Sequence, residues 1–172
     1  MKKIFVLCVI VCASVSVKAQ LYLGGSLGFW LNENNSVETT TIKFLPEVGY
    51  SINDKWAVGG VLGYTHVEVD DKDASKTFKF APYARFSFYG TDLVRLFVDG
   101  GISVYSSKVG KGDSETTFST GFEPGVALDL SKRISLVTKF GFFGYREYSE
   151  DHNAFGLNLD GNTLTFGVYY SF

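Results

Sequence analysis

The stretch that decides the fold is FLPEVGYSIND, residues 44–54. Apolar and polar residues alternate along it, as they do in a half-buried strand. Pro46 interrupts the run, and Glu47 falls on the opposite face. Proline cannot donate a hydrogen bond to a sheet, so it is normally excluded from the middle of one. The fold must therefore be a sheet that accepts proline on an apolar face and a carboxylate on the other face.

The chain begins with two lysines, an apolar run over residues 4–13 and then SVSVKAQ, within a total of 172 residues. A basic start, a short apolar run and small residues before a cut are typical of a secretory signal peptide. Val17 and Ala19 match the small-residue pattern, so we expect cleavage between Ala19 and Gln20. The alternative is an uncleaved membrane anchor, but the run is shorter than the roughly 20 residues that a spanning helix needs.

Cleavage would also remove both cysteines, Cys8 and Cys12. A lipoprotein is not expected, because Cys12 follows Val11, where a small residue would be needed, and Cys8 lies too near the start. The mature chain would then have no disulfide and no cysteine metal site. Three of the 16 basic residues leave with the signal, so 13 remain against 18 acidic ones and the formal net charge is −5. This acidic balance argues against a nucleic-acid partner.

Alternation with a period of two continues through most of the remaining chain and predicts eight strands. They are expected at residues 20–31, 41–52, 56–67, 77–89, 94–106, 118–130, 134–146 and 162–172. Most are 11 to 13 residues long, which matches the roughly 9–11 residues of a tilted strand that crosses a bilayer.

The connections between these strands alternate in length. Residues 53–55, 90–93 and 131–133 are short and turn-like, whereas residues 32–40, 66–75, 107–117 and 147–161 are longer and polar. Short turns on one side and long loops on the other are the pattern of an outer-membrane barrel. We therefore predict an all-β, eight-stranded antiparallel up-and-down transmembrane β-barrel over residues 20–172, with both termini in the periplasm.

Each strand has one large apolar face and one small polar face. In the fourth strand Phe78, Phe80, Phe86 and Phe88 oppose residues such as Ser87. A soluble lipocalin-like barrel would carry many lysines and glutamates on its second face. Here that face is mostly Gly, Ser, Thr, Ala and Tyr, which suits the filled interior of an eight-stranded barrel. The apolar face then meets lipid, and the sheet must close because hydrocarbon offers backbone groups no partner.

This interpretation accounts for the prolines. Pro46, Pro82 and Pro124 each lie on the apolar face of an even-numbered strand, in the related stretches FLPEVGY, FAPYARF and FEPGVAL. We expect a bulge or widened pairing at each. The opposite face carries charged residues at similar heights, with Glu123 slightly above the others, and we expect them to pair and close the lumen: Glu47, Arg85, Asp99, Glu123 and Lys139.

The chain as a whole resembles the small outer-membrane β-barrel family of Gram-negative bacteria, of the OmpX/Ail and OmpA-barrel type, and in particular versions from Bacteroidetes. The resemblance rests on P-E-V-G-Y at residues 46–50, the polar turn at 53–55, W-A-V-G at 56–59 and the terminal GVYYSF. It implies that the assembly machinery recognises the last strand through Phe172 and Tyr170. The family implies no single activity, because members act as adhesins, defence factors, envelope stabilisers or small channels.

Other motifs favour structural interpretations. Residues 24–28 spell G-x-S-x-G, but a nucleophile elbow needs a strand, a turn and a helix, so we expect no catalytic residues here. His66 and His152 are isolated, and Asp70, Asp71 and Asp73 lack the glycine and terminal glutamate of a calcium loop. We expect no cofactor and no metal. We expect an aromatic girdle near the turns, formed by Tyr50, Trp56, Phe88 and Tyr170.

The function expected from the sequence is that of a non-enzymatic integral outer-membrane barrel with a structural or surface-interaction role. Its expected partners are outer-membrane lipid, the assembly machinery and an extracellular partner of unknown identity. Two alternatives from other classes remain at this point: a small-solute channel through the lumen, and a barrel enzyme that acts on lipid or peptide.

Overall fold

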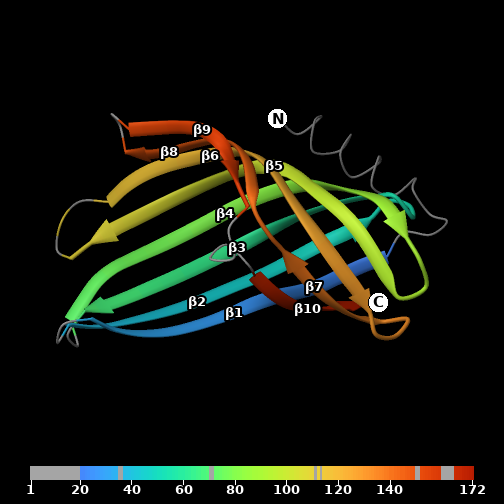
Figure 1. The fold of residues 1–172 in the computed structure, drawn as a ribbon, viewed down its shortest axis with the longest axis horizontal. Helices are drawn as coiled ribbons and strands as arrows, with labels where there is room; N and C mark the ends of the chain where they lie inside the picture. Colours follow the sequence, from blue (N-terminus) through green and yellow to red (C-terminus); the bar gives the residue numbers. More distant parts are fainter. Residues whose placement is uncertain are drawn as a thin grey trace, which may run out of the picture.

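The computed structural model describes residues 20–34, 37–69, 72–110, 112, 114–149, 152–159 and 165–172. These residues form ten strands (Figure 1): β1 Gln20–Asn34, β2 Val37–Ser51, β3 Trp56–Val69, β4 Lys72–Gly90, β5 Val94–Val109, β6 Ser114–Asp129, β7 Ile134–Lys139, β8 Phe142–Ser149, β9 His152–Asn158 and β10 Thr165–Ser171. A helix long and apolar enough to cross a membrane is not found among them. The expected signal peptide, residues 1–19, lies outside the described residues.

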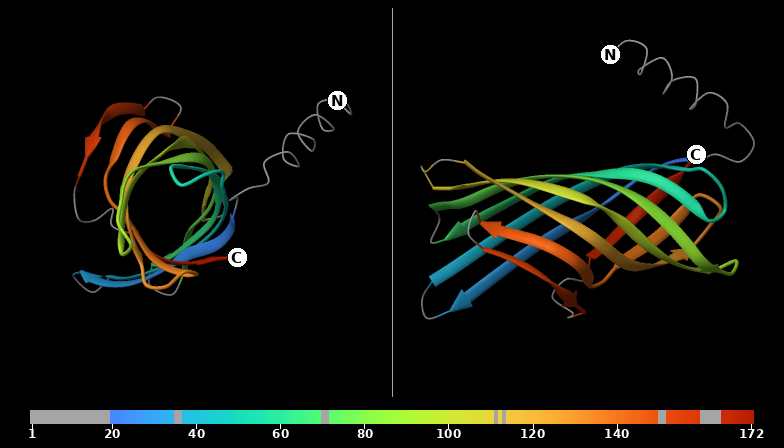
Figure 2. Two further views of the ribbon diagram at one scale, coloured as in Figure 1. Left: turned by 90° about the vertical axis from the view of Figure 1, so that its right-hand side faces the viewer. Right: turned by 90° about the horizontal axis from the view of Figure 1, so that it is seen from above.

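The strands close into a barrel. Hydrogen-bonded neighbours run β5-β4-β3-β2-β1-β10-β7-β6, and the pairing of β5 with β6 completes the circle. Figure 2 shows the ring end-on. All pairings are antiparallel. The predicted fold class, an eight-stranded up-and-down barrel, is confirmed, and β8 and β9 are added to it as a further hairpin beside β6.

The three predicted short turns are present, and each uses a side-chain oxygen to hold its backbone. Asn53 Oδ1 accepts hydrogen bonds from the backbone N–H groups of Lys55 and Trp56, at 2.9 and 2.8 Å. Thr91 Oγ1 and Ser131 Oγ accept in the same way from the N–H three residues later, at 3.0 Å each. Such Asx and hydroxyl turns fix a tight reversal. We call this end of the barrel the turn end and the opposite end the hairpin end.

The predicted loops at the hairpin end were wrong. Residues 32–40, 66–75 and 107–117 mostly continue the strands as long hairpins, and β4 alone has 19 residues. The ladders remain in register to Asn34↔Val37 and Lys108↔Ser114. The polar composition suggested loops, but β-branched threonines and valines in these segments favour strands. Beyond the membrane both faces of a strand meet water, so the apolar alternation disappears although the strand continues.

The predicted seventh strand, residues 134–146, is broken in two. β7 ends at Lys139 and β8 begins at Phe142. Between them Gly141 has a φ of 73°, in the left-handed region that glycine adopts freely. β6 pairs first with β7, where the last pair is Gly125↔Lys139, and then with β8, where the first pair is Phe122↔Phe143. The register of β8 against β6 is therefore shifted by one residue from that of β7.

The predicted loop 147–161 was also wrong, because it contains β9, which pairs with β8 along its whole length. The last strand, predicted at 162–172, is described as β10 over Thr165–Ser171; residues 162–164 lie outside the described residues.

Each proline coincides with a gap in one ladder, as expected. The β2–β3 ladder pauses between Phe44↔Tyr64 and Glu47↔Val61, beside Pro46. The β4–β5 ladder pauses at Pro82, between Phe80↔Val104 and Tyr83↔Gly101, and both ladders resume in register. At Pro124 the pause is the junction between β7 and β8, where the Pro124 carbonyl accepts from the Phe140 N–H at 3.0 Å. Each proline, which has no backbone N–H to donate, therefore lies where the ladder to one neighbouring strand is interrupted.

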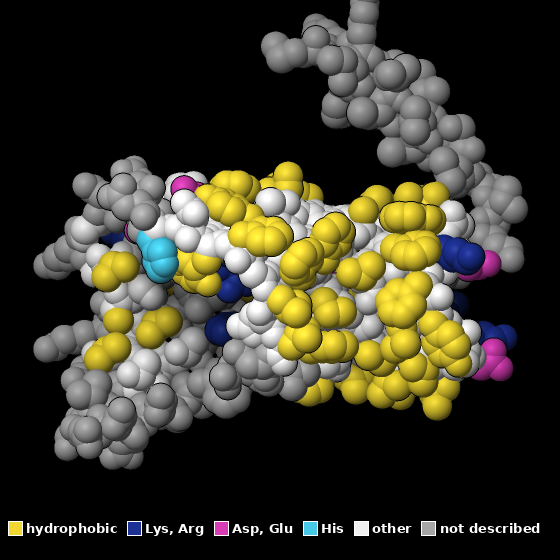
Figure 3. Space-filling model, turned by 45° about the horizontal axis from the view of Figure 1, so that its top comes forward, with side chains coloured by type: hydrophobic (Ala, Val, Ile, Leu, Met, Phe, Trp, Pro, Cys, Tyr) yellow, Lys and Arg dark blue, Asp and Glu magenta, His cyan; other side chains and the backbone are white. Residues whose placement is uncertain are grey.

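The outer surface carries a belt of exposed apolar side chains (Figure 3). Toward the hairpin end the outward positions change from apolar to polar residues. On β3 Tyr64 is followed by His66, and on β5 Val104 is followed by Ser106. On β4 the change runs from Phe78 to Lys76. The belt has the apolar-outside pattern of a transmembrane barrel.

Candidate functional site in the lumen

The barrel interior holds a compact cluster of charged side chains that lies nearer the turn end of the strands than the hairpin end. Glu47 on β2, Arg85 on β4 and Asp99 on β5 have only 5%, 6% and 3% of their surfaces exposed. Lys139, at the end of β7, completes the group. We call these four residues the polar plug. Its two cations and two carboxylates balance, which buried charges require.

Arg85 and Asp99 form the strongest pair in the plug. They are directly opposite one another on β4 and β5, so their side chains emerge on the same face at close range. Arg85 Nε donates to Asp99 Oδ1 at 2.7 Å, and Nη2 donates to Oδ2 at 2.8 Å. This two-pronged geometry is the most favourable one for an arginine and a carboxylate.

Glu47 is the centre of the plug. Its Oε1 accepts from Arg85 Nη2 at 3.2 Å and from the Tyr83 hydroxyl. Its Oε2 accepts from Lys139 Nζ at 3.0 Å and from the Tyr169 hydroxyl at 2.6 Å. Lys139 Nζ also lies 3.0 Å from Asp99 Oδ2. Four donors therefore satisfy the acceptor capacity of this one carboxylate.

Three tyrosines extend the network into the barrel wall. The Tyr83 hydroxyl gives its proton to Glu47, so it accepts from the Tyr22 hydroxyl, 2.6 Å away. The Arg85 guanidinium lies 5.2 Å from the centre of the Tyr83 ring and 4.1 Å from that of Phe97. These distances suit cation–π attraction. The rings and the ion pairs together fill the cross-section.

Glycines provide the room for these rings. A Cβ added at Gly49 would lie 2.1 Å from the Tyr22 ring, and one at Gly24 would lie 2.4 Å from the Tyr169 ring. A Cβ at Gly59 would meet the Tyr83 hydroxyl at 2.5 Å. Each of these glycines lies directly opposite its tyrosine on the neighbouring strand, so the tyrosine ring lies over the glycine backbone.

Small cavities lie on both sides of the polar plug. On the hairpin side, Lys79, Glu123, Lys139 and Arg146 line a cavity of about 110 Å³; a second one, of about 30 Å³, shares several of these residues. On the turn side, a cavity of about 40 Å³ is bounded by Arg85. Tyr169 and Val137 line both the larger hairpin-side cavity and the turn-side cavity, so these side chains form part of the partition.

The structure brings four of the five predicted lumen residues into one network. Glu123 faces the lumen opposite Asp99 but takes no part in the ion pairs between described residues, and it borders the hairpin-side cavities instead. Sequence reasoning missed the role of Tyr22, Tyr83 and Tyr169. Each of them lies on the small-residue face, and a large polar ring among glycines was the signal that could have revealed it.

The other candidate residues are not gathered into a site. Residues 24–28 lie within β1, and Ser26 lines the hairpin-side cavity. His66 contacts Glu68 at 2.8 Å on β3, and His152 is exposed on β9. Asp70 and Asp71 lie outside the described residues, as does the side chain of Asp73. Among the described residues, no three His, Cys, Asp or Glu side chains are grouped as a metal ion would require.

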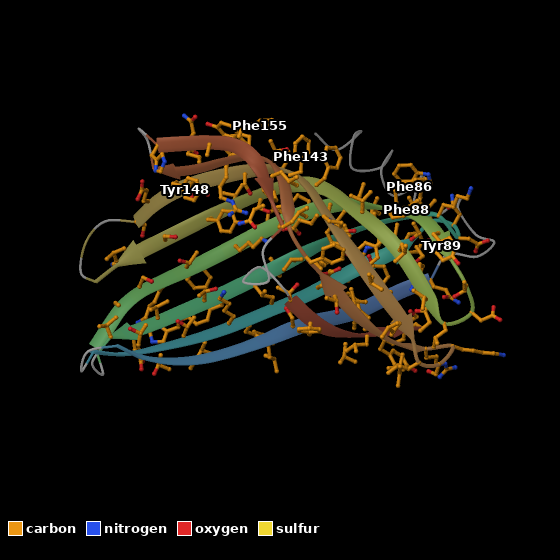
Figure 4. The ribbon with its side chains drawn as sticks, viewed as in Figure 1. Phe86, Phe88, Tyr89, Phe143, Tyr148 and Phe155 are labelled. Atoms are coloured by element: carbon orange, nitrogen blue, oxygen red, sulfur yellow. The ribbon has the colours of Figure 1, made fainter. Side chains whose placement is uncertain are left out.

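Aromatic residues gather near both ends of the barrel. Trp56, Phe88 and Tyr170 are exposed near the turns, as predicted, whereas Tyr50 is half-buried. Figure 4 shows Phe86, Phe88 and Tyr89 at the turn end, and Phe143, Tyr148 and Phe155 on the β8–β9 hairpin. The rings of Tyr170 and Phe172, the predicted assembly signal, pack edge to face at 5.1 Å.

The fold has solved counterparts. The N-terminal β-barrel domain of Pseudomonas aeruginosa OprF is 13% identical, with a TM-score of 0.54 over 90% of this chain and 96% of that one. Yersinia pestis Ail, solved with the heparin analogue sucrose octasulfate, is 14% identical, with a TM-score of 0.51 over 90% of this chain and 97% of that one. At such identities the likeness concerns the fold alone. A search of curated proteins gave no match.

Residues 4–172 match the model of the outer membrane protein beta-barrel domain. That match covers nearly the whole chain and agrees with the closed barrel, its apolar belt and its filled lumen. The chain belongs to the outer membrane protein beta-barrel domain family, and its place is the outer membrane.

Proposed function

We propose that this protein is a non-enzymatic integral outer-membrane barrel whose hairpin end faces outward and contacts a partner outside the cell. The observation that carries the proposal is the length of the hairpins. A strand of 19 residues, such as β4, is about 60 Å long, which exceeds what a bilayer crossing uses even when strands are tilted. The strands continue past the edge of the apolar belt and so form an ordered surface beyond the membrane.

The charge of the hairpin end indicates the kind of partner. The four segments 32–40, 66–75, 107–117 and 147–161 contain twelve acidic and three basic residues, a formal net charge of −9. A surface of this sign attracts basic partners and repels polyanions. Ail was solved with a heparin analogue, but a polyanion of that kind does not suit this acidic end. The partner that we propose is a basic protein or peptide surface.

The main alternative is a small-solute channel. A channel needs a continuous wet path, whereas the hairpin-side and turn-side cavities lie on opposite sides of the polar plug and its tyrosines. The enzyme alternative has less support, because residues 24–28 lie in a strand that pairs on both sides. These observations favour the surface-interaction role.

Two further parts of the proposal concern export. Residues 1–19 are removed between Ala19 and Gln20 as a signal peptide, as their composition suggests. The assembly machinery then reads the last strand, in which Tyr170 and Phe172 are exposed. N-terminal sequencing of the protein from outer membranes tests the first part, and deletion of Phe172 tests the second by loss of assembled barrel.

The surface role can be tested by shortening one hairpin at a time. In the test variant, Asn-Gly replaces residues 67–75 and joins the paired residues His66 and Lys76, which removes a net charge of −3. In the control, Asn-Gly replaces residues 106–116 and joins Tyr105 to Thr117, with no net change in charge. Asn-Gly favours a two-residue hairpin turn.

Refolded barrels in uncharged micelles are then passed over immobilised polylysine, heparin and neutral dextran. The full barrel and the control should bind polylysine, and the variant without residues 67–75 should bind it several-fold more weakly. A change in gel mobility on boiling verifies that each variant is folded. Preference for heparin, or equal losses in the two shortened barrels, would contradict the proposal.

A further inference from the structure

The hairpin-side cavity carries an excess of positive charge that the polar plug does not neutralise. Three cations line it, Lys79, Lys139 and Arg146, against two carboxylates, Glu47 and Glu123. Lys139 is already paired with Glu47 and Asp99. We propose that Lys79 and Arg146 form a binding site for an oxyanion, specifically the phosphate group of a phosphate ester. This proposal does not depend on which partner the hairpins contact.

Neither cation has a carboxylate partner among the described residues. The Lys79 ammonium lies 5.5 Å from the centre of the Tyr105 ring, and the Arg146 guanidinium lies 4.6 Å from that of Phe142. Both side chains are half-buried. Such contacts hold a cation in place but leave its N–H groups available to a ligand. An arginine fork beside a lysine is a combination that suits phosphate.

The register of the strands directs both side chains into the cavity. Lys79 lies on β4 opposite Gly63, in line with the inward residues Ala81 and Tyr83. Arg146 on β8 lies opposite Ser119, which is buried. The one-residue shift at Gly141 has therefore turned the even-numbered positions of β8 toward the lumen. An unbroken strand would have pointed Arg146 to lipid.

The size of the cavity limits what can enter. A cavity of about 110 Å³ is several times the minimum that a single water molecule needs, so it has room for a phosphate group. The hydroxyl-bearing residues Ser26 and Thr165 also line the cavity and can donate to phosphate oxygens. The rest of the ligand would project toward the hairpin end, as part of either a soluble molecule or a lipid headgroup.

The carboxylate of Glu123 would repel a bound anion, so its neutralisation should change the affinity in the opposite direction from neutralisation of the two cations. It lines the same cavity and lies beside Asp99 across β5 and β6. Its neutralisation should strengthen binding, whereas neutralisation of Lys79 or Arg146 should weaken it. The acidic hairpins add a general repulsion, which physiological salt screens over about 8 Å.

The test is an NMR titration of ¹⁵N-labelled barrel in uncharged micelles with inorganic phosphate. The Arg146 Nε–H signal should shift and saturate. Lys79→Gln should weaken the apparent affinity about tenfold, the usual consequence of losing one charge-assisted hydrogen bond. Glu123→Gln should strengthen it several-fold. Lys108→Gln is the control, because it removes the same charge from an exposed position on β5 that does not line the cavity.

Shifts that do not saturate, or equal weakening by Lys79→Gln and Lys108→Gln, would overturn the proposal. If Lys79→Gln fails to refold, Arg146→Gln carries the same comparison, with the backbone amide signals of the cavity-lining residues Ser26 and Thr165 as the readout. Two further titrations identify the source of the phosphate, one with glycerol 3-phosphate and one with micelles that contain phosphatidic acid. Tighter binding of the first indicates a soluble ester, and tighter binding of the second indicates a lipid headgroup.

Discussion

At the scale of single residues, the register of β4 and β5 makes Asp99 the main partner of Arg85. Arg85 makes two hydrogen bonds to Asp99 and one longer bond to Glu47. Arg85→Ala leaves Asp99 with Lys139 alone at 3.0 Å and should destabilise the barrel by about 3 kcal/mol, the low end for a broken buried pair.

Double-mutant cycles on the denaturant midpoint of the refolded barrel measure how this loss is distributed. The coupling between Arg85→Ala and Asp99→Asn should exceed that between Arg85→Ala and Glu47→Gln, because contacting residues are not additive. Equal couplings would mean that the two carboxylates share the guanidinium evenly, contrary to the geometry.

A second prediction concerns the glycines of the lumen. Gly49→Ala places a methyl group against the Tyr22 ring, so it should lower the free energy of unfolding by about 1–3 kcal/mol, as overpacking does. Gly90→Ala is the matched control, because nothing lies within 4 Å of its added Cβ. Urea midpoints of the two variants decide the comparison, and similar midpoints would show that Tyr22 moves aside without loss.

The sequence predicted which residues of this site face the lumen but not how they pair. Alternation alone placed Glu47, Arg85, Asp99 and Lys139 on the inner face. It could not say which cation meets which carboxylate, because that depends on register, and register is set by ladders and turns. Tyr83 and Tyr169 were on the correct face, but their bonds to Glu47 cross the lumen, and no local pattern shows such contacts.

At the scale of elements, period-two alternation identified the strands wherever one face meets lipid, and it failed where both faces meet water. The hairpins past Tyr64 and Val104 lost the pattern but kept their ladders. The break between β7 and β8 was also missed. Gly141 has a left-handed backbone conformation that ends the strand, but nothing in the surrounding apolar sequence indicates that conformation. The alternation of apolar and polar residues therefore indicates where a strand contacts the membrane, and it does not indicate where the strand ends.

The edge of the apolar belt can be located with single cysteines introduced into the full-length chain. Its own two cysteines, Cys8 and Cys12, lie in the expected signal peptide, so residues 20–172 contain no other cysteine. Ser106→Cys should react with a membrane-impermeant maleimide on intact cells, and Val104→Cys, two residues away on the same face of β5, should not. Asp92→Cys, in a short turn, should react only after the cells are permeabilised. Labelling of Asp92→Cys on intact cells would invert the proposed orientation.

At the scale of the whole molecule, the proposed function describes a membrane-anchored platform with an acidic hairpin end and an interior filled by the polar plug. The segments at the hairpin end carry a formal charge of −9, whereas the three short turns 53–55, 90–93 and 131–133 carry +1. This asymmetry orients a charged partner toward one end only. The polar plug lies between the two ends and separates the small cavities.

The blocked interior leads to a prediction about conductance. The barrel as it exists should show no steady current in a planar bilayer. Tyr169 lines both the hairpin-side and the turn-side cavity, so Tyr169→Ala should connect them and produce small, steady openings, although it also removes one donor from Glu47. Phe166→Ala is the control, because Phe166 lies on the same strand but is exposed on the lipid face. Steady current through the unmodified barrel, with none gained in Tyr169→Ala, would mean that ions pass by a route other than past Tyr169, and the channel function would then replace the platform as the better account of this protein.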